Sequence, residues 1–142
     1  MDEAGKSGNE VVIERGVERL DVEFIYELLQ QTHWARNRPR DVFERALKHS
    51  LCFGAYEGKR QVGFARVDQA TFGYVQDCVV DPAGRGRGIG RSLLQHVMED
   101  PIVSSLRTLL LLTETAHALY RKAGFALAPN PQDLMVRYRG DL

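Results

Sequence analysis

The stretch VVDPAGRGRGIGRSLL, Val79 to Leu94, places four glycines and three arginines within eight consecutive positions. An apolar run precedes these positions, and Ile89, Leu93, Leu94 and Val97 recur behind them at helical spacing. A glycine-rich turn between a strand and a helix exposes unpaired backbone N–H groups at the positive end of the helix dipole. Three arginines at a helix start oppose that dipole unless an anion compensates. The stretch therefore predicts a phosphate-binding loop.

Two common phosphate-binding motifs do not fit this loop. The Rossmann fingerprint needs a third glycine where Ile89 or Arg91 stands, and a P-loop needs a Gly-Lys pair followed by Ser or Thr. An arginine–glycine segment that binds nucleic acid is usually longer and unstructured. This one lies between two predicted elements.

The segment Arg85-Gly86-Arg87-Gly88-Ile89-Gly90 resembles the Arg/Gln-x-x-Gly-x-Gly/Ala signature of the GNAT superfamily of acyl-CoA N-acyltransferases. The runs VVDP, GRSLLQHVM, TLLLLT and AHALYRKAGF follow the order and spacing of that family, so the resemblance extends from Thr71 to Phe125. It implies an α/β (α+β) fold, with a mixed, splayed central β-sheet flanked by helices on both faces and coenzyme A between two parallel strands that part. It also implies transfer of an acetyl group from acetyl-CoA to a primary amine, by direct attack in a ternary complex.

Hydrophobic periodicity predicts the other elements. Before the loop, it predicts a strand at 11–14, a helix over 20–29 capped by Asp21, a helix started by Pro39 and Asp41, a hairpin over 51–68 and a strand within 71–80. After the loop, it predicts a helix ended by Asp100-Pro101, a central strand at 108–113 buried on both faces, a helix with a glycine cap at Gly124 and a last strand at 134–138.

The resemblance assigns two groups of residues to coenzyme A. Those expected to hold its phosphates, through backbone amides or arginine side chains, are Arg85, Gly86, Arg87, Gly88, Ile89, Gly90 and Arg91. Those expected to contact the pantetheine arm are Val79, Val80, Thr113 and Ala116. Thr113 stands where most relatives have an asparagine.

Tyr120 matches the usual general acid of the family and is expected beside the cofactor. A thiol with a pKa near 8.5 and a tyrosine with a pKa near 10 differ by only about 2 kcal/mol, so Tyr120 can protonate a departing thiolate. Asp77 is the candidate general base or substrate anchor. As a base it would need burial to raise its pKa, or would act through water. The alternative is an aspartate paired with an arginine such as Arg66.

The basic loop HWARNRPR, residues 33–40, falls where the family's acceptor site is usually walled. Trp34 and Arg38 from this loop, with Arg66 and Asp77 from the neighbouring strands, are the expected acceptor-binding residues. The alternative is that Trp34 anchors the core and that the arginines form a solvated face.

Composition limits the remaining possibilities. The 142 residues carry no formal net charge, which argues against nucleic-acid and membrane partners, and Cys52 and Cys78 lack metal-ligand spacing. The polar start lacks the apolar centre of a signal peptide, so we expect a disordered tail over 1–10 and a cytoplasmic location. We expect one GNAT acetyltransferase domain over 11–142. The expected partners are a small-molecule or peptide amine and, because relatives are often dimers, a second copy of the chain. The alternative function is a catalytically idle acyl-CoA-binding regulatory module.

Overall fold

The computed structural model describes residues 10–139, and the chain divides into two compact units, Met1–Leu112 and Thr113–Leu142. Apart from Glu10, the expected N-terminal tail lies outside the described residues. The single-domain boundary at 11–142 stays a prediction.

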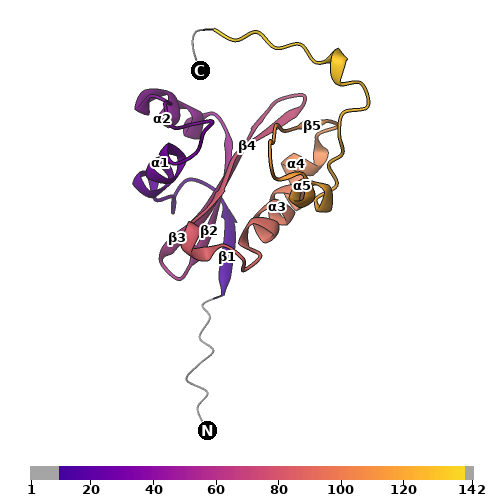
Figure 1. Cartoon of the computed structure of the whole chain (residues 1–142). Coiled ribbons are helices and arrows are strands. Elements are labelled where there is room, and N and C mark those ends of the chain that lie inside the picture. Colours follow the sequence, from indigo (N-terminus) through magenta and orange to yellow (C-terminus); the bar gives the residue numbers. More distant parts are fainter. Residues whose placement is uncertain (1–9, 140–142) are drawn as a thin grey trace. The chain divides into compact units, whose positions relative to one another are not determined.

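The first unit contains a five-stranded sheet in the order β1-β2-β3-β4-β5 (Figure 1). The strands are β1 Val11–Arg15, β2 Leu51–Glu57, β3 Arg60–Gln69, β4 Gly73–Val80 and β5 Leu109–Leu110. The first four strands are antiparallel neighbours, and β4 and β5 are parallel. The predicted hairpin is confirmed, and β4 and β5 are the two parallel strands that the resemblance implies.

Helices cover both faces of this sheet, as expected (Figure 1). On one face lie α1 Val22–Gln30 and α2 Arg40–Lys48, and on the other lie α3 Ile89–Glu99 and α4 Pro101–Ser105. The predicted cap of α1 is confirmed, because the Asp21 carboxylate accepts the Phe24 N–H at 3.1 Å. Burial of the apolar stripe of each helix against the sheet gives one core layer per face.

The side chains at the end of β4 point alternately into the two core layers. Phe64 and Val79 pack with α1 and α2, whereas Val80 packs with Val62 and Ile89 on the α3 side. Consecutive residues of a strand point to opposite faces, so the end of β4 contributes to both layers.

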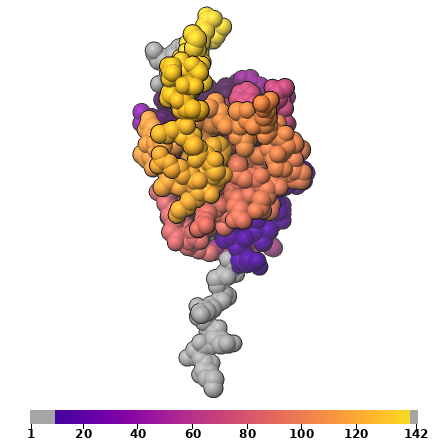
Figure 2. Space-filling view, turned by 90° about the vertical axis from the view of Figure 1, so that its right-hand side faces the viewer, coloured from indigo at the N-terminus to yellow at the C-terminus, as the bar shows by residue number. Residues whose placement is uncertain are grey.

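Near the junction of α3 and α4 the first unit is also held together by charge. Arg15 at the end of β1 forms an ion pair with Asp100 at 3.2 Å, and β1, in indigo, lies next to α3 in the space-filling view (Figure 2). Asp100-Pro101 ends α3 as predicted, and the Asp100 carboxylate then caps α4 by accepting the N–H groups of Ile102 and Val103. The sequence did not predict α4.

The strand predicted at 108–113 is wrong in extent and in burial. Only Leu109 and Leu110 pair with β4, both are half-buried, and the Leu112 side chain is 59% exposed. A continuous apolar run becomes a strand buried on both faces only where other elements pack on both faces of the sheet around it. Among the described residues, the sheet order ends at β5.

The second unit contains α5 His117–Lys122, and the predicted glycine cap is confirmed. Gly124 has a φ of +95°, its N–H donates to the Arg121 carbonyl, and the Phe125 N–H donates to the Tyr120 carbonyl. This is the hydrogen-bond pattern of a Schellman motif. The strand predicted at 134–138 is wrong, since these residues join no ladder in the described chain and Met135 is 91% exposed.

Candidate functional site

The end of β4 is open along the edge that faces β5. The β4–β5 ladder contains two pairs, Gly73 with Leu109 and Tyr74 with Leu110. From Val75 to Val80, β4 continues beside β3 without a described β5 partner. The two parallel strands therefore part after Tyr74, and an extended ligand can use the backbone groups of that edge as a neighbouring strand would.

The glycine loop follows directly and has the backbone conformation that its sequence predicts. Gly86 and Gly88 have φ values of +80° and +75°, and a Cβ atom built on either would meet nothing within 4 Å. Glycine is favoured here by the left-handed backbone and not by crowding. The space above the loop is open on the side where these Cβ atoms would project.

At Gly88 the loop becomes α3. The backbone amides of the first turn, those of Ile89, Gly90 and Arg91, have no acceptor within the helix. No side chain caps the helix start. These amides and the positive end of an 11-residue helix form a feature that favours an anion. The arrangement fits the expected phosphate role, which stays a prediction for each residue.

The loop arginines differ in their surroundings. Arg87 forms an ion pair with Glu57 at 2.6 Å, so an existing carboxylate already offsets its charge. Arg85 lines a pocket, and Arg91 is exposed.

That pocket, of about 480 Å³, lies where the end of α1, the loop after it and the end of β4 meet. Its lining residues are Leu28, Gln31, Thr32, His33, Trp34, Cys78, Val79, Val80 and Arg85. The sequence identified Trp34, Val79, Val80 and Arg85. The other lining residues were missed, although most of them adjoin the acceptor loop or the strand end that the sequence did single out.

The loop that carries Trp34 is held in shape locally. The Thr32 hydroxyl donates to the Leu29 carbonyl at 2.7 Å and accepts the Ala35 N–H at 3.2 Å. Ala35 itself is buried in the α1–α2 core layer. Trp34 lies between these anchored positions, and its side chain remains 51% exposed.

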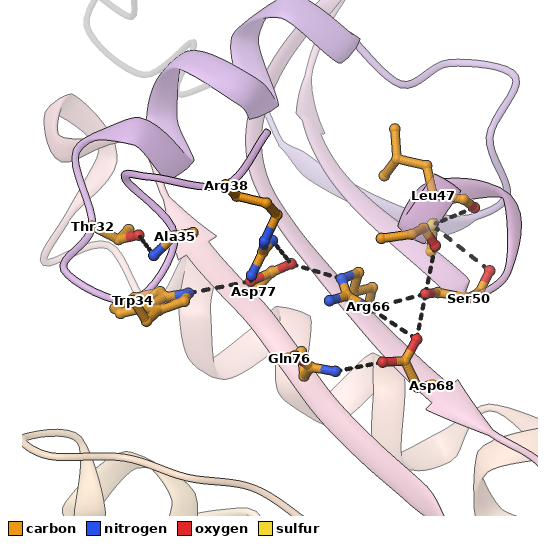
Figure 3. Close-up of polar contacts among 12 residues, drawn as sticks. Thr32, Trp34, Ala35, Arg38, Leu47, Ser50, Arg66, Asp68, Gln76 and Asp77 are labelled. Carbon is orange, nitrogen blue, oxygen red and sulfur yellow. Dashed lines mark hydrogen bonds and ion pairs between the residues drawn. The ribbon is translucent and has the colours of Figure 1, made fainter. Parts of the chain in front are cut away.

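The four residues expected to bind the acceptor meet at the Asp77 carboxylate (Figure 3). Arg38 Nη1 and Arg66 Nε each donate to it at 2.6 Å, and Trp34 Nε1 donates at 3.2 Å. Asp77 has a φ of +55° and lies at a bulge, where the β3–β4 register shifts. The bulge changes the direction of the Asp77 side chain, which is 1% exposed.

This arrangement corrects one expectation for Asp77. Burial raises its pKa, but the hydrogen bonds and positive charges of Arg38 and Arg66 outweigh that effect, so the pKa lies below its ordinary value. The direct base role depended on a raised pKa, whereas action through water and the substrate-anchor role stay predictions. The alternative, an aspartate paired with Arg66, describes the geometry.

The network extends away from the pocket through Arg66. Its Nη1 atom donates to Asp68 at 2.8 Å and to the Ser50 hydroxyl at 3.1 Å, and Gln76 also donates to Asp68 (Figure 3). Two arginines and two aspartates therefore form one charge-balanced cluster, which we call the Asp77 cluster: Arg38, Arg66, Asp68 and Asp77.

Comparison with known proteins identifies the family. A family model described as an acetyltransferase (GNAT) domain matches residues 48–127, more than half of the chain. This chain belongs to the GNAT family. Its fold is that of a crystal structure from Xanthomonas campestris pv. campestris described as belonging to the GNAT family, with 42% identity, a TM-score of 0.87 and coverage of 92% of this chain and 94% of that one.

Two curated relatives are more distant. An acetyltransferase-like protein of Gibberella zeae is 32% identical over 63% of this GNAT chain and 62% of its own length. The chloroplastic serotonin N-acetyltransferase 2 of Oryza sativa subsp. japonica is 29% identical over 89% of this chain and 67% of its own. This GNAT chain thus spans about three fifths of the length of the first relative and two thirds of the second.

The remaining residues that the resemblance assigns to the cofactor site belong to the second unit. There the Thr113 hydroxyl accepts the Ala116 N–H at 3.0 Å just before α5. The Tyr120 ring meets Phe125 edge to face, with 6.0 Å between centroids. The expected contacts of Thr113, Ala116 and Tyr120 with the cofactor stay predictions.

Residues 10–139 of this GNAT chain contain no group of three or more His, Cys, Asp or Glu side chains placed to hold a metal ion. Within the same residues, no helix has the length and apolar character needed to cross a membrane. The cytoplasmic location and the homodimer stay predictions.

Proposed function

We infer that this GNAT chain is an N-acetyltransferase that moves the acetyl group of acetyl-CoA to a primary amine. GNAT acetyltransferases use acetyl-CoA, and the rice relative carries the name of an enzyme that acetylates serotonin, an amine. The observation that carries the proposal is a meeting of three features in the first unit: the open β4 edge, the uncapped start of α3 and the pocket that includes Arg85.

The residues present fit coenzyme A. The amides of residues 86–91 and the Arg85 side chain would hold its phosphates, because unpaired N–H groups and a helix N-terminus favour anions. The Val79 and Val80 backbones would pair with the pantetheine arm along the open edge of β4. Bound there, acetyl-CoA supplies the activated acetyl group.

Transfer needs no covalent enzyme intermediate. The amine nitrogen attacks the thioester carbonyl carbon, a C–N bond forms, the C–S bond breaks, and the nitrogen passes its surplus proton to water. Holding the two reactants together supplies much of the rate enhancement. An amine with a pKa near 10.4 is mostly protonated at pH 7. Forming the neutral amine that attacks therefore costs about 4.6 kcal/mol. The apolar walls at Leu28 and Val79 favour its neutral form.

Tyr120 is the proposed general acid, which gives its hydroxyl proton to the departing thiolate. Because general acid catalysis contributes roughly 100-fold or more, Tyr120→Phe should lower kcat by about that factor. The Kd for coenzyme A should change little, because the hydroxyl acts on the leaving sulfur only. Turnover of Tyr120→Phe equal to that of the unaltered chain would remove Tyr120 from this role.

Thiol release tests the proposed function directly. The purified chain is mixed with acetyl-CoA and a panel of primary amines, free thiol is measured, and the acetylated amine is identified by mass. Coenzyme A binding is measured separately by calorimetry. Binding without thiol release for any amine identifies the idle acyl-CoA-binding module instead, and absence of binding contradicts both functions.

A further inference from the structure

The walls of the pocket indicate what kind of amine it accepts. Leu28, Trp34 and Val79 are apolar or aromatic, and Gln31 and Thr32 are polar without charge. The described lining residues include the cation Arg85 but no carboxylate. A carboxylate at the surface is the strongest attraction that a pocket can offer to the second ammonium group of a polyamine or an aminoglycoside.

Asp77, behind the Trp34 indole, does not supply that carboxylate. Its side chain is 1% exposed and already accepts hydrogen bonds from Arg38, Arg66 and Trp34. Asp68 is likewise taken up by Arg66, Ser50 and Gln76. The negative charge of the Asp77 cluster is offset within the cluster, so a second ammonium group gains no attraction from it.

Trp34 presents an oriented aromatic surface instead. Its N–H is fixed on Asp77, and the His33 ring meets it edge to face with 5.2 Å between centroids. Half of the Trp34 side chain is nevertheless exposed at the pocket. An indole that is held by its polar edge and open at its apolar surface is preorganised to pack against another ring.

We propose that the acceptor is an aromatic primary amine with a single cationic group, whose ring packs on Trp34. This inference rests on the proposed function and specifies its substrate class. The aromatic ring of the acceptor replaces water on the exposed indole, and the amine extends toward the strand end at Val79 and Val80.

Three amines of graded chemistry test the substrate class by thiol release: 2-phenylethylamine, the ring-free propylamine and the polycation spermidine. The expected kcat/KM for 2-phenylethylamine exceeds that for each of the other two by about tenfold. The reason is that contact between the acceptor ring and the Trp34 indole stabilises the complex beyond the apolar area that it buries. An equal or higher kcat/KM for spermidine overturns the substrate class while leaving acetyl transfer intact. Failure of all three amines overturns this inference, and the wider amine panel together with coenzyme A binding then decides the proposed function.

Variants separate the role of Trp34 from general damage. Trp34→Ala should raise the KM for 2-phenylethylamine about tenfold and that for propylamine less than twofold, whereas Trp34→Phe should keep most of the ring effect. The matched control is Phe72→Ala, because Phe72 is similarly exposed, at 50%, and does not line the pocket. Equal KM increases for both amines in Trp34→Ala overturn the packing of the acceptor ring on Trp34.

Trp34 also provides a readout that does not depend on turnover. It is the only tryptophan of the chain, so intrinsic fluorescence reports on this one side chain. Titration of 2-phenylethylamine into the coenzyme A complex should change the emission with saturation, and spermidine should not. A saturable change with spermidine alone contradicts the proposal.

Discussion

The Asp77 cluster and the glycine loop are both rich in charge, yet one is saturated and the other is open. In the Asp77 cluster, each arginine meets a carboxylate within 2.8 Å, and the Asp77 carboxylate is 1% exposed. In the loop, the glycines border open space, α3 starts without a side-chain cap, and Arg85 lines a pocket. Polar groups that are fully hydrogen-bonded within the protein stabilise the fold, whereas backbone amides without a partner in the protein can bind a ligand.

The largest effect on stability should come from Asp77→Asn. This variant leaves Arg38 and Arg66 partly or fully buried without their shared counter-charge, which costs about 3 kcal/mol or more in the free energy of unfolding. Glu14→Gln is the control, because Glu14 and Arg19 form an exposed ion pair and such pairs contribute at most about 1 kcal/mol. Urea denaturation measures both variants. Similar losses in the two variants would show that the Asp77 cluster is not the stabilising feature.

The same variant gives the pH dependence a definite sign. Because the pKa of Asp77 is lowered in the folded chain, its contribution is present above the unfolded pKa of about 4 and is lost as pH falls through the folded value. The difference in the free energy of unfolding between the unaltered chain and Asp77→Asn should therefore be constant near neutral pH and shrink below about pH 4. A difference that grows in acid would contradict the lowered pKa.

The largest effect on binding should come from Gly88→Glu in the open region. A carboxylate at the uncapped start of α3 repels phosphate and occupies the space above the loop, so the Kd for coenzyme A should rise about 100-fold. The matched control is Gly58→Glu in the β2–β3 turn, where φ is +61° and a Cβ atom also meets nothing within 4 Å. Both variants incur the same left-handed backbone strain, and calorimetry should detect weaker binding only for Gly88→Glu. Equal Kd values for the two variants would remove the loop from phosphate binding.

The difference between the two regions also explains what could be predicted from the sequence. The glycine loop is a local pattern, in which the turn, the left-handed glycines and the helix start are all encoded within one short stretch. Asp77 instead meets partners 11, 39 and 43 residues away in the chain. The sequence selected all of these residues and offered the Asp77–Arg66 pair as an alternative, but the contacts of Asp77 with Arg38 and Trp34 follow from tertiary packing. The lowered pKa of Asp77 depends on this packing.

The errors in strand prediction have a related cause. Hydrophobic periodicity describes one segment at a time, and a strand forms only when a partner completes its hydrogen bonds. The run at 108–113 finds β4 for two residues, and the run at 134–138 joins no described ladder. By contrast, α1, α3 and the Gly124 cap depend on local signals and were predicted correctly.

The smallest effect should come from Glu57→Gln, which tests an ion pair within the open region, that of Glu57 with Arg87. Glu57 offsets the charge of Arg87, whose side chain is 43% exposed, so a phosphate must compete with this carboxylate for the guanidinium. Removing the carboxylate should lower the Kd for coenzyme A about two- to fivefold at low salt, within the range of a partly exposed ion pair, and the gain should fade as salt rises. Arg87→Ala is the counterpart and should weaken binding by a similar factor. If Glu57→Gln weakens binding instead, Glu57 supports the loop as part of the scaffold, and the boundary between the saturated and open regions lies between Arg85 and Arg87.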